Sequence, residues 1–505
     1  MDWNGHLSIS DRSLLRSART SLAPTRNFVS WISAAAALAA ALALNTLPLQ
    51  FFLLIALTLV CILLLPRTPL SMLVILLVLS PLRTLIATES SLALPLDIGQ
   101  ILLALYLAVW LADAIIRRCP LPSLPAEPVF LSAVGLCIVL AVGVWTSASI
   151  SNWLTEWLKW VGIALLVWIL SQTARANWTW LIVAVLASAT ANAIVGLYIF
   201  FGGSGADHLV ILGRYFRAFG TFGQPNPFGG FMGIALPLAM MCALAKVYQI
   251  ALSFRAGRRP ASSRVAALAI ITLVFAILLA ALLASWSRGA WLGFAASLVV
   301  MLIAFPRRLA KGISYAIALA ALFLSMWFVG LLPRSVVSRL TTAATDLITV
   351  SDVRGIEFYP WNYAVVERIA HWQAAVSMAQ AHPFVGVGLG NYAEVYEDYR
   401  LINWEEALGH AHNLYLNFLA ETGVVGLLAY LAFWLIIFRV TWTTRRHPDW
   451  SARALAVGLL GCWTYIAVHS IFDNLFVNNL FLHVGVLLSV LAILHRQVSH
   501  SLEVE

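Results

Sequence analysis

The sequence predicts an all-α membrane protein that crosses the bilayer many times. Of its 505 residues, 61% are hydrophobic and only 10% are charged, a balance that excludes an ordinary soluble domain. Apolar runs of about twenty residues recur from end to end, and a helix of that length spans the hydrocarbon core of a bilayer. We therefore expect a polytopic bundle of about 12–14 transmembrane helices, with one large extracytoplasmic helical loop.

Candidate spans follow from the apolar runs alone, and about fourteen can be drawn. Most are separated by short connections, and the two long connections are residues 202–226 and 333–411. The spans are expected at about residues 29–45, 48–65, 69–87, 97–116, 127–145, 154–172, 178–201, 228–248, 264–284, 289–305, 312–332, 413–439, 453–471 and 475–494.

The distribution of basic residues orients the bundle. Arginine-containing connections remain in the cytoplasm, and counting spans places nearly all of them on the same side as the basic N-terminal segment. Both termini are therefore expected inside, and residues 333–411 outside. The connections that define this side contain Arg67, Arg117, Arg118, Arg175, Arg255, Arg258, Arg259, Arg264, Arg307, Arg308, Lys311, Arg445, Arg446 and Arg496.

The expected organisation has five parts. Residues 1–28 form a cytoplasmic tail without a recognisable cleavage site, and residues 29–332 form an N-terminal bundle of about eleven spans. Residues 333–411 form the outer loop, residues 412–494 the C-terminal spans, and residues 495–505 a second tail.

The outer loop itself contains a predicted helix at residues 367–381, whose apolar residues follow helical spacing. This helix would either lie on the bilayer surface or cap the bundle. It ends before Pro383, and the glycines that follow at residues 386–390 predict a tightly packed turn. Their spacing is not that of a nucleotide-binding loop.

Other features of the composition argue against several classes of partner. The five cysteines lack CxxC spacing, so neither a disulfide framework nor a zinc site is predicted. The net charge of +9 arises from arginines of the cytoplasmic connections, so it does not indicate nucleic-acid binding.

Two histidines stand where the outer loop re-enters the membrane. Residues 409–413 read GHAHN, and an apolar run follows at once. The imidazole of His410 or His412 is suited to proton transfer near neutral pH. A lone histidine at this depth would most simply be an interfacial residue, but the whole string with Asn413 favours a functional site.

Two outward-facing arginine segments accompany the histidines. The first contains Arg214 and Arg217 ahead of a glycine- and amide-containing loop, where arginine can clamp phosphate or bind a lipid headgroup. The clamp is favoured for Arg217, and the two readings are equal for Arg214. The second is the turn Ser285–Gly289, where Arg288 is the only charged side chain. An arginine within a membrane costs roughly 2.5–3.5 kcal/mol to insert, which makes Arg288 a functional candidate.

These residues together resemble the O-antigen ligase and O-antigen polymerase superfamily of membrane glycosyltransferases. That family's pattern is a histidine, a small polar residue, nine residues and then Gly-x-x-Gly, matched here by His412, Asn413 and Gly423–Gly426. Arg217 with its loop and the Ser287-Arg288-Gly289 turn are similar to two further family features. The resemblance covers roughly residues 217–474, and it selects His412 rather than His410.

The resemblance implies a fold of the GT-C class and a bacterial inner-membrane enzyme with its active site facing the periplasm or exterior. The implied donor is a glycan on undecaprenyl diphosphate, and the acceptor is a hydroxyl of lipid A–core or of a growing polysaccharide. Transfer would be inverting and would need no metal and no cofactor. His412 would be the base, and Arg217 and Arg288 would bind the diphosphate. Glu405 and Glu406 would either orient His412 or form a solvated acidic surface.

Other functions remain open at this level. A protein O-oligosaccharyltransferase would use the same donor with a serine or threonine acceptor. A polysaccharide or lipid transporter would also have many spans, but it would place its charges near the bilayer midplane in broken helices of repeated halves. The candidates here cluster at the outward ends of spans.

Overall fold

The computed structural model describes residues 69–89, 97–175, 177–202, 205, 207–333, 335, 337–338, 341, 352–357, 359 and 362–503. The chain divides into two units, Met1–Ile75 and Leu76–Glu505. The spans expected at 29–45 and 48–65 lie outside the described residues.

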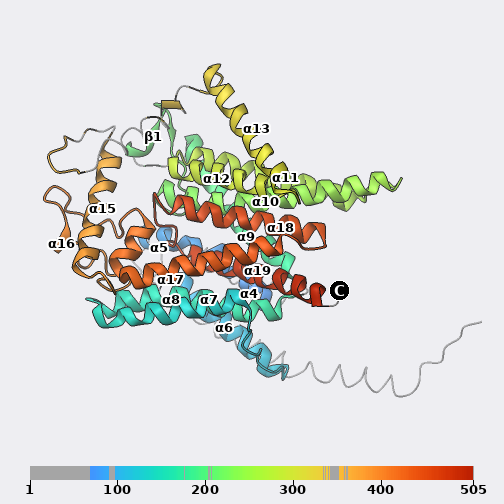
Figure 1. The fold of residues 1–505 in the computed structure, drawn as a ribbon, viewed down its shortest axis with the longest axis horizontal. Helices are drawn as coiled ribbons and strands as arrows, with labels where there is room; N and C mark the ends of the chain where they lie inside the picture. The colour runs from blue at the N-terminus through green and yellow to red at the C-terminus, as the bar shows by residue number, and fades with distance from the viewer. Residues whose placement is uncertain are drawn as a thin grey trace, which may run out of the picture. The chain divides into compact units, whose positions relative to one another are not determined.

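Helices make up most of the described chain, and loops account for nearly all of the rest (Figure 1). A small antiparallel hairpin, β1 (Val210–Ile211) with β2 (Tyr215–Phe216), directly precedes Arg217. Short 3-10 turns are η1 (Ser80–Leu82), η2 (Val142–Thr146) and η3 (Asp207–Leu209). The helices are α4 (Pro69–Leu79), α5 (Arg83–Glu89), α6 (Ile98–Ile116), α7 (Pro128–Ala141), α8 (Ile150–Thr173), α9 (Trp178–Gly202), α10 (Pro225–Arg255), α11 (Ser262–Ala284), α12 (Arg288–Ala304), α13 (Leu309–Phe328), α15 (Tyr363–Ala381), α16 (Tyr396–Tyr399), α17 (Leu414–Thr444), α18 (Trp450–His469) and α19 (Leu480–Glu503).

The predicted fold class is confirmed. Within the described residues, eleven helical segments are long and apolar enough to cross a membrane, and the apolar helix α12 adds a shorter one of 17 residues. Each coincides with an expected span between residues 69 and 494. The last helix differs at its end, because α19 continues to Glu503 instead of stopping near residue 494.

Burial separates inner helices from outer ones. The most apolar windows of α10, α18 and α19 are 78%, 78% and 83% buried inside the protein, against 17% for α11 and 6% for α13. Close approach explains part of this packing: a Cβ built on Gly233 of α10 would lie 1.9 Å from the ring of Tyr465 in α18. The inner helices therefore form the rigid frame, and α11 and α13 expose their apolar side chains as lipid-facing helices do.

The outer-loop helix α15 packs on the bundle. Its buried residues Ala374 and Met378 share one apolar cluster with Tyr392, Ala411 and Ala420, the last of these in α17. This packing fits the second of the two expected placements, a cap over the transmembrane helices. α15 therefore contacts α17, and His410 and His412 lie just before the start of α17.

Candidate active site

Asn413 is the N-cap of α17. Its side-chain oxygen accepts hydrogen bonds from the backbone N–H groups of Tyr415 at 3.0 Å and Leu416 at 3.1 Å. Such a cap satisfies two donors that the first helical turn leaves unpaired. His412 immediately precedes it in the left-handed conformation, with φ 51°, which side chains other than glycine rarely adopt. The cap and this backbone conformation fix the direction in which the imidazole leaves the helix.

The helix α17 is broken at Gly423, the first glycine of the Gly-x-x-Gly pair. Gly423 has φ 62° and ψ −168°, and the loop after α15 enters the break. The backbone N–H of Val424 donates to the carbonyl of Pro383 at 2.9 Å, and that of Val425 donates to Phe384 at 3.2 Å. The nine residues between Asn413 and Gly423 are therefore the helical piece between the cap and the break, so the spacing positions the outer loop against His412.

Replacing Gly423 with alanine should destabilise the protein strongly. A Cβ at this position would lie 2.2 Å from the carbonyl carbon of Phe384, in addition to the unfavourable positive φ. We expect a loss of about 2–5 kcal/mol in the free energy of unfolding, read as a lower melting temperature in detergent. Gly257→Ala is the matched control, because Gly257 has φ 66° but no atom within 4 Å of a built Cβ. Equal effects of the two changes would contradict the packing argument.

His410, His412 and Asp473 form one cluster. Nδ1 of His412 lies 3.4 Å from Oδ1 of Asp473, and Nε2 of His410 lies 3.8 Å from the same oxygen. Nδ1 of His410 accepts the backbone N–H of His412 at 3.1 Å. Nε2 of His412 is buried and has no hydrogen-bond partner among the described residues. The Nδ1 edge of the His412 ring thus faces a carboxylate, and neither ring nitrogen has a hydrogen-bond partner among the described residues.

Asp473 lies in the turn between α18 and α19 and is only 2% exposed. Burial alone would raise its pKa. The hydrogen-bonding proximity of His412 and the attraction of His412, His410 and Arg368 outweigh burial, and they hold the pKa well below its usual range. Burial, followed by repulsion from His412, lowers the pKa of His410 to about 4. At neutral pH the cluster therefore contains an ionised carboxylate and a neutral His410.

Arg217 connects the two arginine segments that were predicted from the sequence. Its Nε donates to the carbonyl of Ser285 at 3.0 Å, and its Nη2 donates to Oδ1 of Asn226 at 3.1 Å. Ser287 caps α12 through its hydroxyl, and Arg288 is the first residue of that helix. The structure thus brings the Arg217 loop and the Arg288 turn together.

The electrostatics of Arg217 link these segments to the histidine cluster. Burial, the largest effect, and repulsion from Arg368 and Arg288 lower the pKa of Arg217 to about 10, while attraction from Asp473 opposes them. The charge of Arg217 is therefore influenced by three other charged side chains, those of Arg288, Arg368 and Asp473. Three guanidinium groups within electrostatic range of one carboxylate give an excess of positive charge, which favours an anionic ligand.

Sequence reasoning missed Asp473, Arg368 and His371 as site residues. The Nε of Arg368 in α15 is buried and has no hydrogen-bond partner among the residues that the structure describes. His371, one turn further along α15, approaches the oxygen of Tyr392 at 3.0 Å through Nδ1, and its ring centre lies 5.8 Å from that of His412. Two signals were present in the sequence: Arg368 within the predicted outer-loop helix, and Asp473 as the one charged residue of the segment 470–479.

Three other candidates lie away from the cluster or outside its contacts. Arg214 is exposed, with its guanidinium 5.5 Å from the centre of the Tyr215 ring. Glu405 and Glu406 are also exposed, and the carboxylate that approaches His412 belongs to Asp473. The acid beside His412 is thus neither Glu405 nor Glu406 but Asp473, about sixty residues after His412 in the sequence.

The cluster also offers metal ligands. One ligand atom each from His410, His412 and Asp473 lie within 4.8 Å of one another. Two imidazoles and a carboxylate are a common donor set for divalent transition metals. The neighbouring arginines oppose a cation at this point, because their repulsion acts on any added positive charge.

Comparison with known proteins identifies the central part of this chain. Residues 273–431 match the family model described as O-antigen ligase. This central segment is similar to an O-antigen ligase domain. The matched segment includes Arg288, Arg368 and His412, whereas Arg217 and Asp473 lie outside it. No curated protein matches the chain. The family resemblance expected from the sequence is confirmed over this segment, and the matched family implies a glycosyltransferase-type enzyme.

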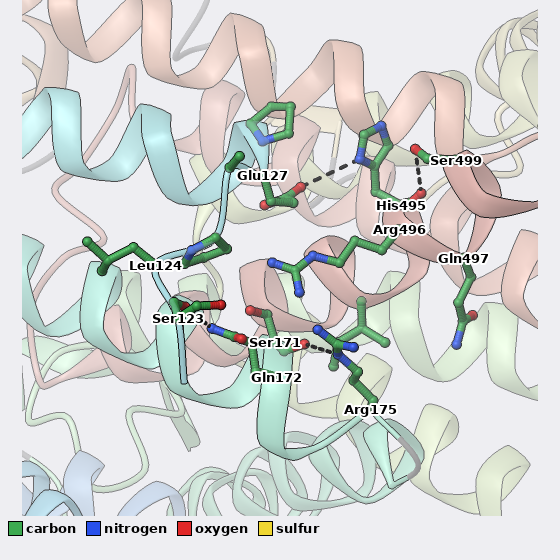
Figure 2. A pocket seen from close by; sticks show the side chains of 14 residues that line it. Ser123, Leu124, Glu127, Ser171, Gln172, Arg175, His495, Arg496, Gln497 and Ser499 are labelled. Atoms are coloured by element: carbon green, nitrogen blue, oxygen red, sulfur yellow. Dashed lines mark hydrogen bonds and ion pairs between the residues drawn. The ribbon is translucent and has the colours of Figure 1, made fainter. Parts of the chain in front are cut away.

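Two cavities lie apart from this cluster, at the other ends of the helices. One, of about 610 Å³, lies between the start of α7 and the ends of α8 and α19. Figure 2 shows Arg175 and Arg496 in this cavity together with the Glu127 and His495 pair. The second, of about 430 Å³, is lined by arginines near the ends of α12 and α17. Neither contains a residue of the candidate active site.

Proposed function

We propose that the protein transfers a glycan from an undecaprenyl-diphosphate carrier to an acceptor hydroxyl, as an O-antigen ligase or polymerase. The observation that carries this proposal is the position of His412 against the buried carboxylate of Asp473, beside Arg217 and Arg288. Glycosyl transfer from a diphosphate needs a proton acceptor for the hydroxyl and positive charge for the leaving group. The cluster supplies both.

His412 acts as the base in this reaction. The acceptor hydroxyl gives its proton to Nε2 of His412 while its oxygen forms a bond to the anomeric carbon. The bond from that carbon to the diphosphate oxygen breaks, and the diphosphate departs with the bonding electrons. Asp473, facing Nδ1, keeps that nitrogen protonated and stabilises the imidazolium that forms. A single displacement of this kind inverts the anomeric centre.

The arginines stabilise the departing diphosphate. Negative charge increases on the diphosphate as its bond to the sugar breaks, and preorganised cations in a buried site are most effective there. Arg217 is held by Ser285 and Asn226, so its guanidinium is already oriented before the donor binds. Arg288 and Arg368 add charge from α12 and α15, which we propose replaces a metal ion.

A transfer assay tests this function. Purified protein is incubated with an undecaprenyl-diphosphate-linked oligosaccharide and, separately, with lipid A–core, with a second lipid-linked repeat, or with a serine-containing peptide. Product on the first acceptor identifies a ligase, on the second a polymerase, and on the third a protein O-oligosaccharyltransferase. Hydrolysis or transport of the donor without any glycosylated acceptor would refute the proposal.

Transfer should persist in chelator. Because arginines neutralise the diphosphate, we expect the rate in EDTA to stay within about twofold of the rate without it, since no metal contributes to leaving-group stabilisation. The measurement compares initial rates in EDTA, in magnesium and in zinc. Loss of transfer in EDTA, restored by one of these metals, would instead assign His410, His412 and Asp473 as metal ligands.

The active site should face outward from the cytoplasm. Arg445 and Arg446 follow the end of α17, the helix that begins just after His412 and Asn413, and basic connections remain inside. We expect an impermeant thiol reagent applied to intact cells to label a cysteine at Asp352 in the outer loop, in a variant with the native cysteines removed. A cysteine at Arg446 should be labelled only after permeabilisation, and the reverse pattern would invert the topology.

A further inference from the structure

A cavity of about 430 Å³ is lined by four arginines: Arg307, Arg445, Arg446 and Arg453. They come from the connection after α12, the end of α17 and the start of α18. No acid lines this cavity, and within the described part of the chain no ion pair joins any of the four to a carboxylate. We name this set the arginine pocket.

Part of the arginine pocket has a structural role. Nη1 of Arg445 donates to the carbonyl of Ala304 at 3.3 Å, and Nη2 of Arg453 donates to that of Phe305 at 2.6 Å. Both carbonyls lie at the C-terminus of α12, where positive charge is favourable. These contacts account for one N–H group of each arginine and leave the remaining donors unexplained.

The rest of the arginine pocket is uncompensated positive charge. Within the described part of the chain, the Nε of Arg445 is buried without a hydrogen-bond partner, and its guanidinium carbon lies 3.9 Å from the centre of the Trp442 ring. Burial, then repulsion from Arg446 and Arg453, lowers the pKa of Arg445. Arg307 and Arg446 are exposed at the rim. Holding these like charges together costs free energy unless an anion enters.

The place of the arginine pocket indicates the source of that anion. α12 begins at the transfer site with Arg288 and ends at Ala304, and α17 begins after Asn413 and ends at Thr444. The arginine pocket thus lies at the opposite ends of the same helices. Apolar spans end there, so its side chains lie at the level of lipid headgroups.

We propose that the arginine pocket binds the headgroup of a lipid that carries two phosphates, of the cardiolipin type. The planar fork of arginine binds phosphate oxygens in pairs, and basic pockets between transmembrane helices suit such headgroups. The cavity in Figure 2 differs, because Arg175 and Arg496 share it with Glu127. The inference concerns a separate site and does not depend on the proposed transfer reaction.

The test removes the two arginines that make no contact with α12. The variant Arg307→Gln with Arg446→Gln removes two charges from the arginine pocket and keeps the bonds of Arg445 and Arg453 to α12. The control Arg258→Gln with Arg259→Gln removes two exposed charges from the connection between α10 and α11. Each purified full-length protein is titrated in detergent with cardiolipin, phosphatidylglycerol or inorganic pyrophosphate, and melting temperature and lipid retention by native mass spectrometry are recorded.

We expect cardiolipin to bind the native protein and the control equally and to bind the arginine-pocket variant about 25-fold more weakly. That figure follows from roughly a fivefold contribution by each basic residue near a lipid surface. Phosphatidylglycerol, with one phosphate, should stabilise the native protein less than cardiolipin does. Equal weakening in the control would reduce the effect to general surface charge. Equal protection by pyrophosphate would overturn the assignment to a lipid.

Discussion

Replacing His412 with alanine should abolish transfer and leave donor binding almost intact. The imidazole accepts the hydroxyl proton, which moves only as the transition state forms, so its removal lowers turnover rather than ground-state affinity. We expect kcat to fall by about 10²–10⁴-fold, the usual contribution of a positioned base. The measurement pairs single-turnover transfer with binding of a fluorescent lipid-linked donor.

Two further changes separate the base from the groups that position it. His410→Ala should retain much more activity than His412→Ala. Its effect is indirect, because Nδ1 of His410 accepts the backbone N–H of His412 and Nε2 approaches Asp473 at 3.8 Å. The activity of Asp473→Asn should lie between those of His410→Ala and His412→Ala, since a neutral amide no longer stabilises the charge of the imidazolium. An active His412→Ala beside an inactive His410→Ala would reassign the base.

The fold was accessible from the sequence because hydropathy reports burial in lipid directly. Long apolar runs gave the spans, and the histidine-to-glycine spacing located the helical piece of α17 between its cap and its break. The small polar residue of that pattern is an N-cap in the structure, a role that local sequence chemistry can supply. Such features depend on residues within a few turns of one another.

The carboxylate of the site was not accessible in the same way. Asp473 reaches His412 because the turn after α18 packs on the start of α17, where the N–H of Leu414 donates to the carbonyl of Ser470 at 2.8 Å. That contact follows from how the whole bundle packs, and no local pattern encodes it. Glu405 and Glu406 were chosen for their nearness in sequence, which says little about distance in a folded helical bundle.

Substituting Arg217 with lysine should reduce both donor affinity and turnover. The guanidinium holds the Ser285 carbonyl and the Asn226 side chain at once, and a single ammonium cannot reproduce that planar fork. Loss of one preorganised donor to a developing anion typically costs about 10²–10³-fold in kcat. In the proposed reaction the arginine, unlike the base, contacts the diphosphate in both the ground state and the transition state, so the affinity for the lipid-linked donor should fall as well. Arg288→Lys should behave alike.

Matched controls decide whether this loss reflects a diphosphate clamp or only the charge of the segment. Arg214→Gln removes an exposed positive charge three residues before Arg217, and it should leave transfer nearly unchanged. Asn226→Ala keeps the Arg217 charge but removes one contact that orients it, so we expect a loss of less than about tenfold. If Arg214→Gln were as damaging as Arg217→Gln, attraction of the donor by net charge would explain the result. A clamp depends on the direction of the guanidinium as well as on its charge. It is therefore supported only if the loss of transfer increases from Arg214→Gln to Asn226→Ala and is largest for Arg217→Lys.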